Sequence, residues 1–105
     1  MISTHILDTT KGVAAQGVSV LLEMKSASDW KTIAVDKTNA DGRIVFECPK
    51  VEGVFRLTFN IEDYFGNAEH FFLNTPIVFQ VKDTKRKYHV PLLLNPYGYS
   101  TYRGT

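Results

Sequence analysis

The segment Val54-Phe55-Arg56-Leu57-Thr58-Phe59-Asn60 alternates between apolar and polar side chains from its second residue onward. Phe55, Leu57 and Phe59 fall on one side of an extended chain, and the polar residues between them fall on the other. This period of two predicts a β-strand with one face in a hydrophobic core and the other toward solvent.

Two extended runs upstream have the same character. In the segment from Val18 to Met24, every second residue is apolar, and Val18, Val20, Leu22 and Met24 fall on one face. The next extended run is Trp30 to Lys37. Between them, Ala27-Ser28-Asp29 has the composition of a turn. We therefore expect these two runs to form an antiparallel hairpin.

Two further extended runs lie downstream, from Ile77 to Lys82 and from Tyr88 to Leu94. They flank Asp83-Thr84-Lys85-Arg86-Lys87, whose clustered positive charge is typical of a solvated loop. The simplest interpretation is a hairpin with this basic loop as its turn.

A tight turn is predicted in the middle of the chain. Asn39-Ala40-Asp41-Gly42 supplies side-chain acceptors and a glycine that tolerates a positive φ angle. The turn leads into the apolar run Ile44-Val45-Phe46, which Pro49 ends. Arg43 is therefore expected at the mouth of a strand.

One short helix is predicted directly after the Val54–Asn60 strand. Ile61-Glu62-Asp63-Tyr64-Phe65 has acidic residues in its first turn, Asn60 is a suitable N-cap, and Gly66-Asn67 ends it. The other runs are short, rich in β-branched and aromatic residues, and separated by Gly, Pro, Asn and Asp. We therefore expect an all-β sandwich with one helix, in a single domain spanning residues 1–105.

Composition limits the possible partners. The 12 basic and 11 acidic residues give a net charge of +1, which is too small to recruit nucleic acid or a membrane surface. Cys48 is the only cysteine, so an internal disulfide is impossible. No secretory signal or apolar stretch of about 20 residues is present, and we expect a cytoplasmic protein.

Three histidines are the candidates for chemistry near neutral pH. By spacing alone, His89 is most simply a core or edge residue satisfied by a backbone carbonyl, because it lies beside Pro91 in an apolar strand. His5 precedes an apolar pair near the N-terminus and has the pattern of a structural or merely exposed residue. His70 lies in a polar stretch and is expected at the surface.

Metal binding and nucleophilic catalysis have little local support. No two histidines have His-x-His or His-x3-His spacing, and no cysteine pair exists, so no metal site is expected. Cys48 lies at a strand end without a neighbouring base and is expected to be a packed thiol. Ser100 and Thr101 lack the glycine pattern of a nucleophile elbow.

The segment from Tyr88 to Thr105 is unusual for the end of a chain. It contains four tyrosines, one histidine and one arginine, together with several leucines. Terminal segments are usually polar unless they are held against other parts of the protein. We therefore expect this segment to form part of a functional site.

Three motifs resemble those of the 5-hydroxyisourate hydrolases, the enzyme branch of the transthyretin fold. Tyr102-Arg103-Gly104-Thr105 is similar to the C-terminal signature of that family, in which serine is the usual last residue. Ser3-Thr4-His5-Ile6-Leu7-Asp8-Thr9 resembles its opening motif, and Asn39-Ala40-Asp41-Gly42-Arg43 resembles its internal turn. The resemblance implies a transthyretin-like, or prealbumin-like, two-sheet sandwich.

The resemblance also implies an activity and a set of site residues. The activity is metal-independent, cofactor-free hydrolysis of the cyclic amide of 5-hydroxyisourate, which gives 2-oxo-4-hydroxy-4-carboxy-5-ureidoimidazoline during urate degradation. The resemblance implies three catalytic residues. His89 is the general base and His5 is its partner, and these two roles can be exchanged. Arg43 orients the substrate and stabilises the oxyanion. The implied substrate-binding residues are His5, Arg43, Tyr102, Arg103, Gly104 and Thr105.

In this family the subunits form a homotetramer, a dimer of dimers, with the sites at the dimer–dimer interface. The resemblance therefore implies the same assembly here, with a small molecule as the only other partner. One alternative is a transthyretin-type carrier that binds an aromatic ligand without hydrolysis, which the Pro96-Tyr97 and Tyr99-Ser100-Thr101 segments allow. Another is an adhesive or accessory β-sandwich, which explains the alternating strands alone.

Overall fold

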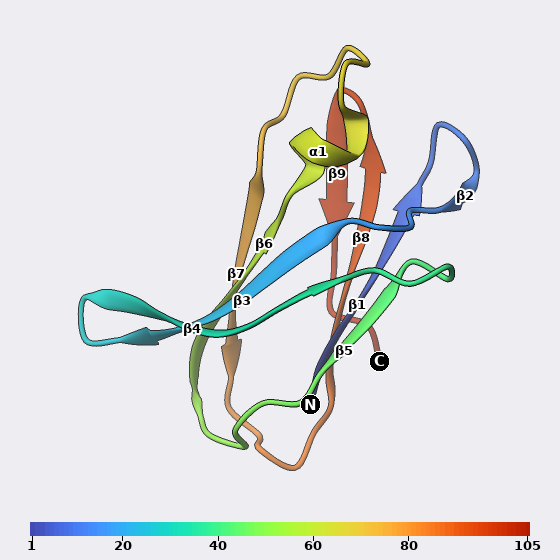
Figure 1. Cartoon of the computed structure of the whole chain (residues 1–105). Coiled ribbons are helices and arrows are strands. Elements are labelled where there is room, and N and C mark those ends of the chain that lie inside the picture. The colour runs from blue at the N-terminus through green and yellow to red at the C-terminus, as the bar shows by residue number, and fades with distance from the viewer.

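Two β-sheets pack face to face across one hydrophobic core in the computed structural model, which describes residues 1–105 (Figure 1). The core contains seventeen buried apolar residues. They include Phe55, Leu57 and Phe59, which occupy the alternate positions that the sequence pattern predicts for the core. Burial of these side chains is the main force that holds the two sheets together.

The first sheet contains the N-terminal strand and the C-terminal hairpin. In this sheet β1 pairs in parallel with β8, β8 pairs with β9, and both β2 and β5 pair with the other edge of β1. The bounds are β1 Ile2–Asp8, β2 Val13–Ala14, β5 Arg43–Phe46, β8 Tyr88–Asn95 and β9 Gly98–Thr101.

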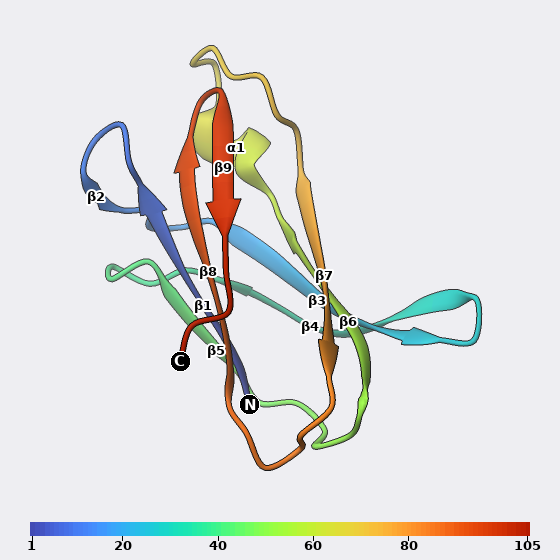
Figure 2. The ribbon, with the colours of Figure 1, turned by 180° about the vertical axis from the view of Figure 1, so that it is seen from behind.

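The second sheet has the order β4-β3-β6-β7, with every pair antiparallel. Its strands are β3 Ser19–Ser26, β4 Asp29–Lys37, β6 Gly53–Phe59 and β7 Thr75–Val81. The predicted hairpin between the first two is confirmed, and its tip extends away from the body of the molecule (Figures 1 and 2). A register shift beside Leu22 and Glu23 marks a bulge in this hairpin.

The predicted helix, α1, is also confirmed and spans Ile61–Phe65. The side chain of Asn60 caps it by accepting a hydrogen bond from the backbone N–H of Asp63 at 3.3 Å. Ile61 is its buried residue and anchors it to the core. No helix in the structure is long and apolar enough to span a membrane.

The predicted hairpin around the basic loop is wrong. The strands β7 and β8 lie in different sheets, so Asp83–Lys87 crosses from one layer of the sandwich to the other. The hydroxyl oxygen of Tyr88 accepts from the backbone N–H groups of Lys82 and Asp83, at 3.2 and 3.0 Å, and so fixes the start of this crossing. A polar, charged loop is compatible with a hairpin turn within one sheet and with a crossing between two sheets. Its composition indicates that the loop is exposed to solvent, but not with which strand the next strand pairs.

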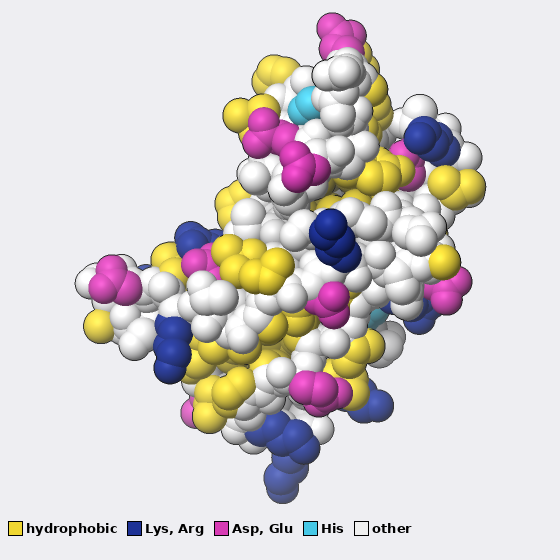
Figure 3. Space-filling model, in the orientation of Figure 1, with side chains coloured by type: hydrophobic (Ala, Val, Ile, Leu, Met, Phe, Trp, Pro, Cys, Tyr) yellow, Lys and Arg dark blue, Asp and Glu magenta, His cyan; other side chains and the backbone are white.

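The charged side chains are spread over the surface. Figure 3 shows basic and acidic groups interspersed on one face, with apolar side chains between them. This distribution agrees with the net charge of +1. Such a mixed surface produces no strong field of one sign on that face.

Candidate active site

His5 and Arg43 are direct cross-strand neighbours in the pairing of β1 with β5. Along β1, buried residues alternate with half-buried ones, and His5 belongs to the half-buried set that faces away from the core. Arg43 is exposed on the same outer face. Opposite residues in an antiparallel pair have Cβ atoms about 4.5–5.5 Å apart, so the imidazole and the guanidinium share one surface.

The turn before Arg43 has the predicted chemistry. The side-chain oxygen of Asn39 accepts from the backbone N–H groups of Asp41 and Arg43, at 2.9 and 3.0 Å. The backbone N–H of Gly42 also donates to the carbonyl of Asn39 at 2.9 Å. This turn therefore fixes where β5 begins, and with it the position of Arg43 opposite β1.

Gly42 allows the turn to pack directly on β1. Its φ angle is +73°, a conformation that side chains with a Cβ adopt only with strain. A Cβ there would lie 2.5 Å from the carbonyl oxygen of Ile6, while the carbonyl of Gly42 accepts from the N–H of Ile6 at 2.8 Å. Both constraints explain the glycine immediately before Arg43.

His89 comes to the same face from the other side of β1. The strand β8 runs parallel to β1, and this register places His89 opposite Ser3 and Pro91 opposite His5. Nδ1 of His89 lies 2.8 Å from Oγ of Ser3, within hydrogen-bonding distance. His89 is therefore half-buried on the outer face of the sheet, and the sequence-based expectation of a side chain satisfied by a backbone carbonyl is wrong.

The C-terminal segment returns to His89 and packs against it. The backbone N–H of Gly104 donates to the carbonyl of His89 at 2.8 Å, and the two residues form an isolated antiparallel bridge. A Cβ on Gly104 would lie 2.6 Å from Cδ2 of the imidazole. Only glycine lets the backbone of the tail lie this close to the ring.

The surroundings lower the pKa of His89 below its ordinary value of 6.5. Burial is the largest cause, because it disfavours the charged imidazolium, and the nearby positive charges of His5 and Arg43 add to it. His89 is consequently neutral at pH 7. A neutral imidazole on a face that also carries a guanidinium combines a proton acceptor with a fixed cation.

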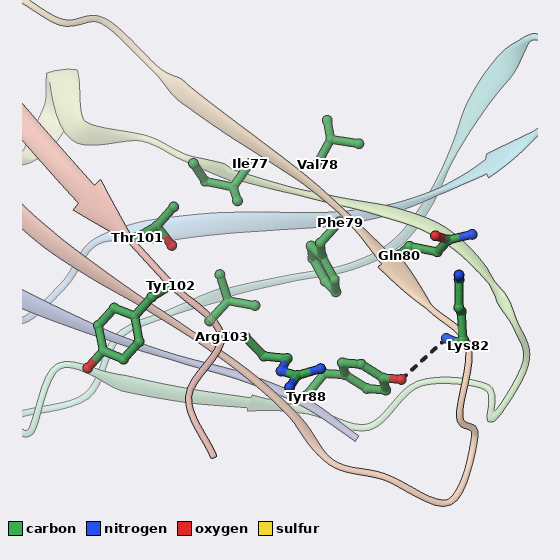
Figure 4. Close-up of a pocket in the computed structure, with 10 residues that line it drawn as sticks. Ile77, Val78, Phe79, Gln80, Lys82, Tyr88, Thr101, Tyr102 and Arg103 are labelled. Atoms are coloured by element: carbon green, nitrogen blue, oxygen red, sulfur yellow. Dashed lines mark hydrogen bonds between the residues drawn. The ribbon is translucent and has the colours of Figure 1, made fainter.

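Tyr102 and Arg103 border a different hollow, of about 390 Å³, which opens between β7 and the C-terminal strands. Figure 4 shows the Arg103 side chain reaching toward the ring of Tyr88, while the Tyr102 ring points away from β7. Thr105 is exposed. Within one chain, then, Gly104 is the member of the terminal tetrapeptide that contacts His89, and the side chain of Arg103 lies in the other hollow.

The third histidine lies elsewhere. His70 stacks on Phe65 of α1 with ring centroids 5.2 Å apart, and its Nδ1 is 2.8 Å from the carbonyl oxygen of Ala68. It is partly exposed, as the sequence predicts for a surface residue. No group of three or more His, Cys, Asp and Glu side chains is gathered closely enough to hold a metal ion.

Ser3 is the site residue that sequence analysis missed. Besides its place at the start of the Ser3–Thr9 motif, its signal is its position two residues before His5, which places both side chains on the same face of β1. Its contact with His89 joins residues 86 positions apart in sequence, so no local pattern reveals it.

The HIUase/Transthyretin family model matches residues 2–104, nearly the whole chain. The chain belongs to this family. A 5-hydroxyisourate hydrolase of Salmonella typhimurium is 41% identical over 110 residues, covering 100% of this chain and 81% of that protein. These findings confirm the resemblance drawn from the three sequence motifs.

Solved structures of the HIUase/Transthyretin family have the same fold. The 5-hydroxyisourate hydrolase of Klebsiella pneumoniae has a TM-score of 0.86 and 37% identity, covering 99% of this chain and 98% of that one. Sea bream transthyretin, in a complex with thyroxine, has a TM-score of 0.90 and 31% identity, covering 99% and 94%. The predicted transthyretin-like sandwich is therefore confirmed, and both branches of the family share it.

Proposed function

We propose that this protein is a 5-hydroxyisourate hydrolase, which opens the cyclic amide of its substrate by hydrolysis to 2-oxo-4-hydroxy-4-carboxy-5-ureidoimidazoline in urate degradation. The observation that carries the proposal is the convergence of His5, Arg43 and His89 from three strands on one outer face. The hydrolases among its relatives support the same activity.

His89 is proposed as the general base. Amide hydrolysis requires that a proton leave water as its oxygen attacks the carbonyl carbon, and a correctly placed neutral imidazole speeds such a step by about 10²- to 10⁴-fold. The lowered pKa of His89 keeps it in the neutral form. His5 is its proposed partner, and the two imidazoles can exchange these roles, because both lie on the same outer face of the sheet.

Arg43 is proposed to orient the substrate and to stabilise the developing oxyanion. The chain has one salt bridge, between Arg56 and Glu23, so the guanidinium of Arg43 has no carboxylate partner. It is also exposed beside His5. A free guanidinium has donors arranged to bind planar imide and ureide edges, and it remains protonated throughout the reaction.

The terminal tetrapeptide, Tyr102 to Thr105, is proposed to complete the substrate pocket. The packing of Gly104 on His89 supports this role, because it brings the tail to the ring of the proposed base. Tyr102 is 57% exposed and offers a flat aromatic wall. In one chain the tail closes only one side of the site, which favours a pocket completed by another subunit.

A homotetramer, arranged as a dimer of dimers with the sites at the dimer–dimer interface, is the assembly that we propose. Large apolar side chains are exposed on the edge strands and the adjacent loops, including Phe71 at 71%, Tyr97 at 61% and Val78 at 57%. Exposed apolar surface of this kind is typical of subunit contacts. Light scattering after size-exclusion chromatography measures the mass, and a monomer of 11.9 kDa would contradict the proposal.

A carrier role is less well supported. A carrier needs an apolar channel, but it has no use for two interacting imidazoles beside an unpaired guanidinium. The named hydrolases, at identities of up to 41%, also favour hydrolysis over transport.

The test is the decay of 5-hydroxyisourate freshly generated from urate by urate oxidase, followed by absorbance. We expect the wild-type protein to accelerate the spontaneous decay, His89→Ala to lose at least about a hundredfold of that acceleration, and His70→Ala to keep it. His70→Ala is the matched control, since it removes the same side chain away from the site. No acceleration by the wild type would contradict the proposed function, and full activity of His89→Ala would contradict the role of that residue.

A further inference from the structure

The imidazole of His89 is held on two sides. On one side, Oγ of Ser3 lies 2.8 Å from Nδ1, and the residues that carry these atoms are direct partners in the parallel pairing of β1 with β8. On the other side, the backbone of Gly104 lies against Cδ2. The ring therefore has one fixed orientation, in which Nε2 has no hydrogen-bond partner within the chain.

The orientation leaves two tautomers to consider, because a serine hydroxyl can both donate and accept. If Ser3 donates its proton to Nδ1, the ring proton lies on Nε2, and the open nitrogen cannot act as a base. If Nδ1–H donates to Ser3, Nε2 has a free lone pair. The hydrogen bond made by one nitrogen thus decides the protonation of the other.

The charges around the ring favour the second arrangement. The ionisable groups that face His89 are His5 on β1 and Arg43 on β5, and the tail contributes the uncharged backbone of Gly104. Nδ1 is occupied by Ser3, so Nε2 is the nitrogen left open to a guanidinium, which interacts better with a lone pair than with an N–H group. Ser3 is half-buried, so its own hydroxyl proton has access to solvent and need not be donated to the ring.

We propose that Ser3 is a positioning residue that accepts a hydrogen bond from Nδ1–H of His89 and so keeps the Nε2 lone pair free to take a proton from water. This inference rests on the proposed hydrolase function. In the reaction, the water oxygen bonds to the carbonyl carbon and its proton passes to Nε2. The ring C–N bond then breaks, and the leaving nitrogen takes the proton back from Nε2.

A neutral partner also fits the electrostatics of the site. An aspartate in the place of Ser3 would fix the same tautomer, as in a Ser-His-Asp triad, but it would stabilise the imidazolium and raise the pKa of His89. Serine fixes the tautomer without adding a charge. The base therefore stays available at and below neutral pH, in agreement with its lowered pKa.

The first arm of the test is spectroscopic and needs no substrate. In protein labelled with ¹⁵N-histidine, two-dimensional NMR above pH 7 distinguishes a protonated ring nitrogen from one with a lone pair. His89→Gln assigns the signals, and His70 is an internal reference, because its Nδ1 faces a carbonyl oxygen and must carry the proton. We expect His89 to be protonated on Nδ1 in the wild type and in Ser3→Thr, and to shift toward protonation on Nε2 in Ser3→Ala.

The second arm is kinetic. We expect Ser3→Ala to lower kcat by about 10- to 100-fold with little change in KM. This magnitude is taken from metal sites, where losing the residue that hydrogen-bonds the second nitrogen of a ligating histidine has an effect of this size. Ser3→Thr keeps the hydroxyl and should restore kcat. Ser28→Ala, an identical change in the exposed turn between β3 and β4, should have wild-type kcat.

The outcomes test the role of Ser3 separately from the proposed hydrolase function. A proton on Nε2 of wild-type His89, or a Ser3→Ala variant with unchanged tautomer and kcat, would overturn the role of Ser3. Wild-type protein that fails to hydrolyse 5-hydroxyisourate would overturn the function, while the NMR arm would still report whether Ser3 controls the tautomer.

Discussion

The backbone of Gly104 lies so close to the imidazole of His89 that a Cβ at this position would come within 2.6 Å of Cδ2. The two residues are also joined by a backbone hydrogen bond of 2.8 Å. The C-terminal segment therefore sets the position of the ring as well as covering one side of it. This contact gives a physical reason for glycine in the terminal tetrapeptide.

Gly104→Ala should displace the imidazole and lower kcat by about a hundredfold, because small misplacements of a reacting group are costly. The melting temperature should change little, since the tail lies on the surface. Gly98→Ala is the matched control, because its Cβ would meet only the Asn95 side chain, at 3.9 Å. Wild-type kcat in Gly104→Ala, measured in the 5-hydroxyisourate assay, would show that the ring tolerates the displacement.

Activity should persist below the ordinary histidine pKa of 6.5, because burial and the charges of His5 and Arg43 lower the pKa of His89. In a profile of kcat/KM against pH, the acid limb should therefore have its midpoint below 6.5. The folded pKa is depressed, so the contribution of this residue to stability is present above pH 6.5 and is lost as pH falls through the folded pKa. An acid limb centred above 6.5 would contradict the assignment of this imidazole as the base.

Tyr64→Phe should lower the free energy of unfolding by about 1.5–3 kcal/mol at pH 7, because the Tyr64 hydroxyl donates to a charged carboxylate of Asp8 at 2.6 Å. Burial is the largest single influence on the pKa of Asp8, and it raises that pKa. The hydrogen bonds from Tyr64 and from the N–H groups of Lys11 and Thr10 together outweigh burial, so the pKa of Asp8 is lowered. Urea unfolding of both proteins measures the difference.

The pH dependence of that difference checks its cause. Because the folded pKa of Asp8 is depressed, its stabilising contribution is present above the ordinary value of 3.8 and is lost as pH falls through the folded pKa. The pKa of Tyr64 is raised to about 12, so its contribution is present below pH 10 and is lost between pH 10 and about 12. A difference between wild type and Tyr64→Phe that stays constant in strong acid would exclude the Asp8 carboxylate as its origin.

Gly42→Ala should destabilise the fold more than Gly17→Ala does. Both glycines have positive φ angles, +73° and +79°, and each substitution carries a conformational cost of about 1–2 kcal/mol. At Gly17 an added Cβ meets nothing within 4 Å, whereas at Gly42 it lies 2.5 Å from the backbone oxygen of Ile6. Equal losses in urea unfolding would mean that the turn before Arg43 shifts freely away from β1.

Much of the fold and part of the site could be predicted from sequence. The turn at Asn39–Gly42, the helix at Ile61–Phe65 and the buried alternation in Val54–Asn60 all form as expected. The sequence pattern does not predict strand β9, Gly98–Thr101, and it predicts the wrong kind of connection for the basic loop. The roles of the site residues, the tetramer and the cytoplasmic location stay predictions, since contacts within one chain position side chains but do not report turnover, assembly or location.

The amino-acid sequence determined the local elements, because turns, caps and alternating faces depend on sterics and hydrogen bonds between residues that are close along the chain. Beyond the β3–β4 hairpin, only the tertiary structure decided which strands pair. The parallel register of β1 with β8 brings Ser3 to His89, and the antiparallel register of β1 with β5 brings His5 to Arg43. Strand pairing depends on the apolar surface that the whole sandwich buries, and no short segment encodes that surface alone.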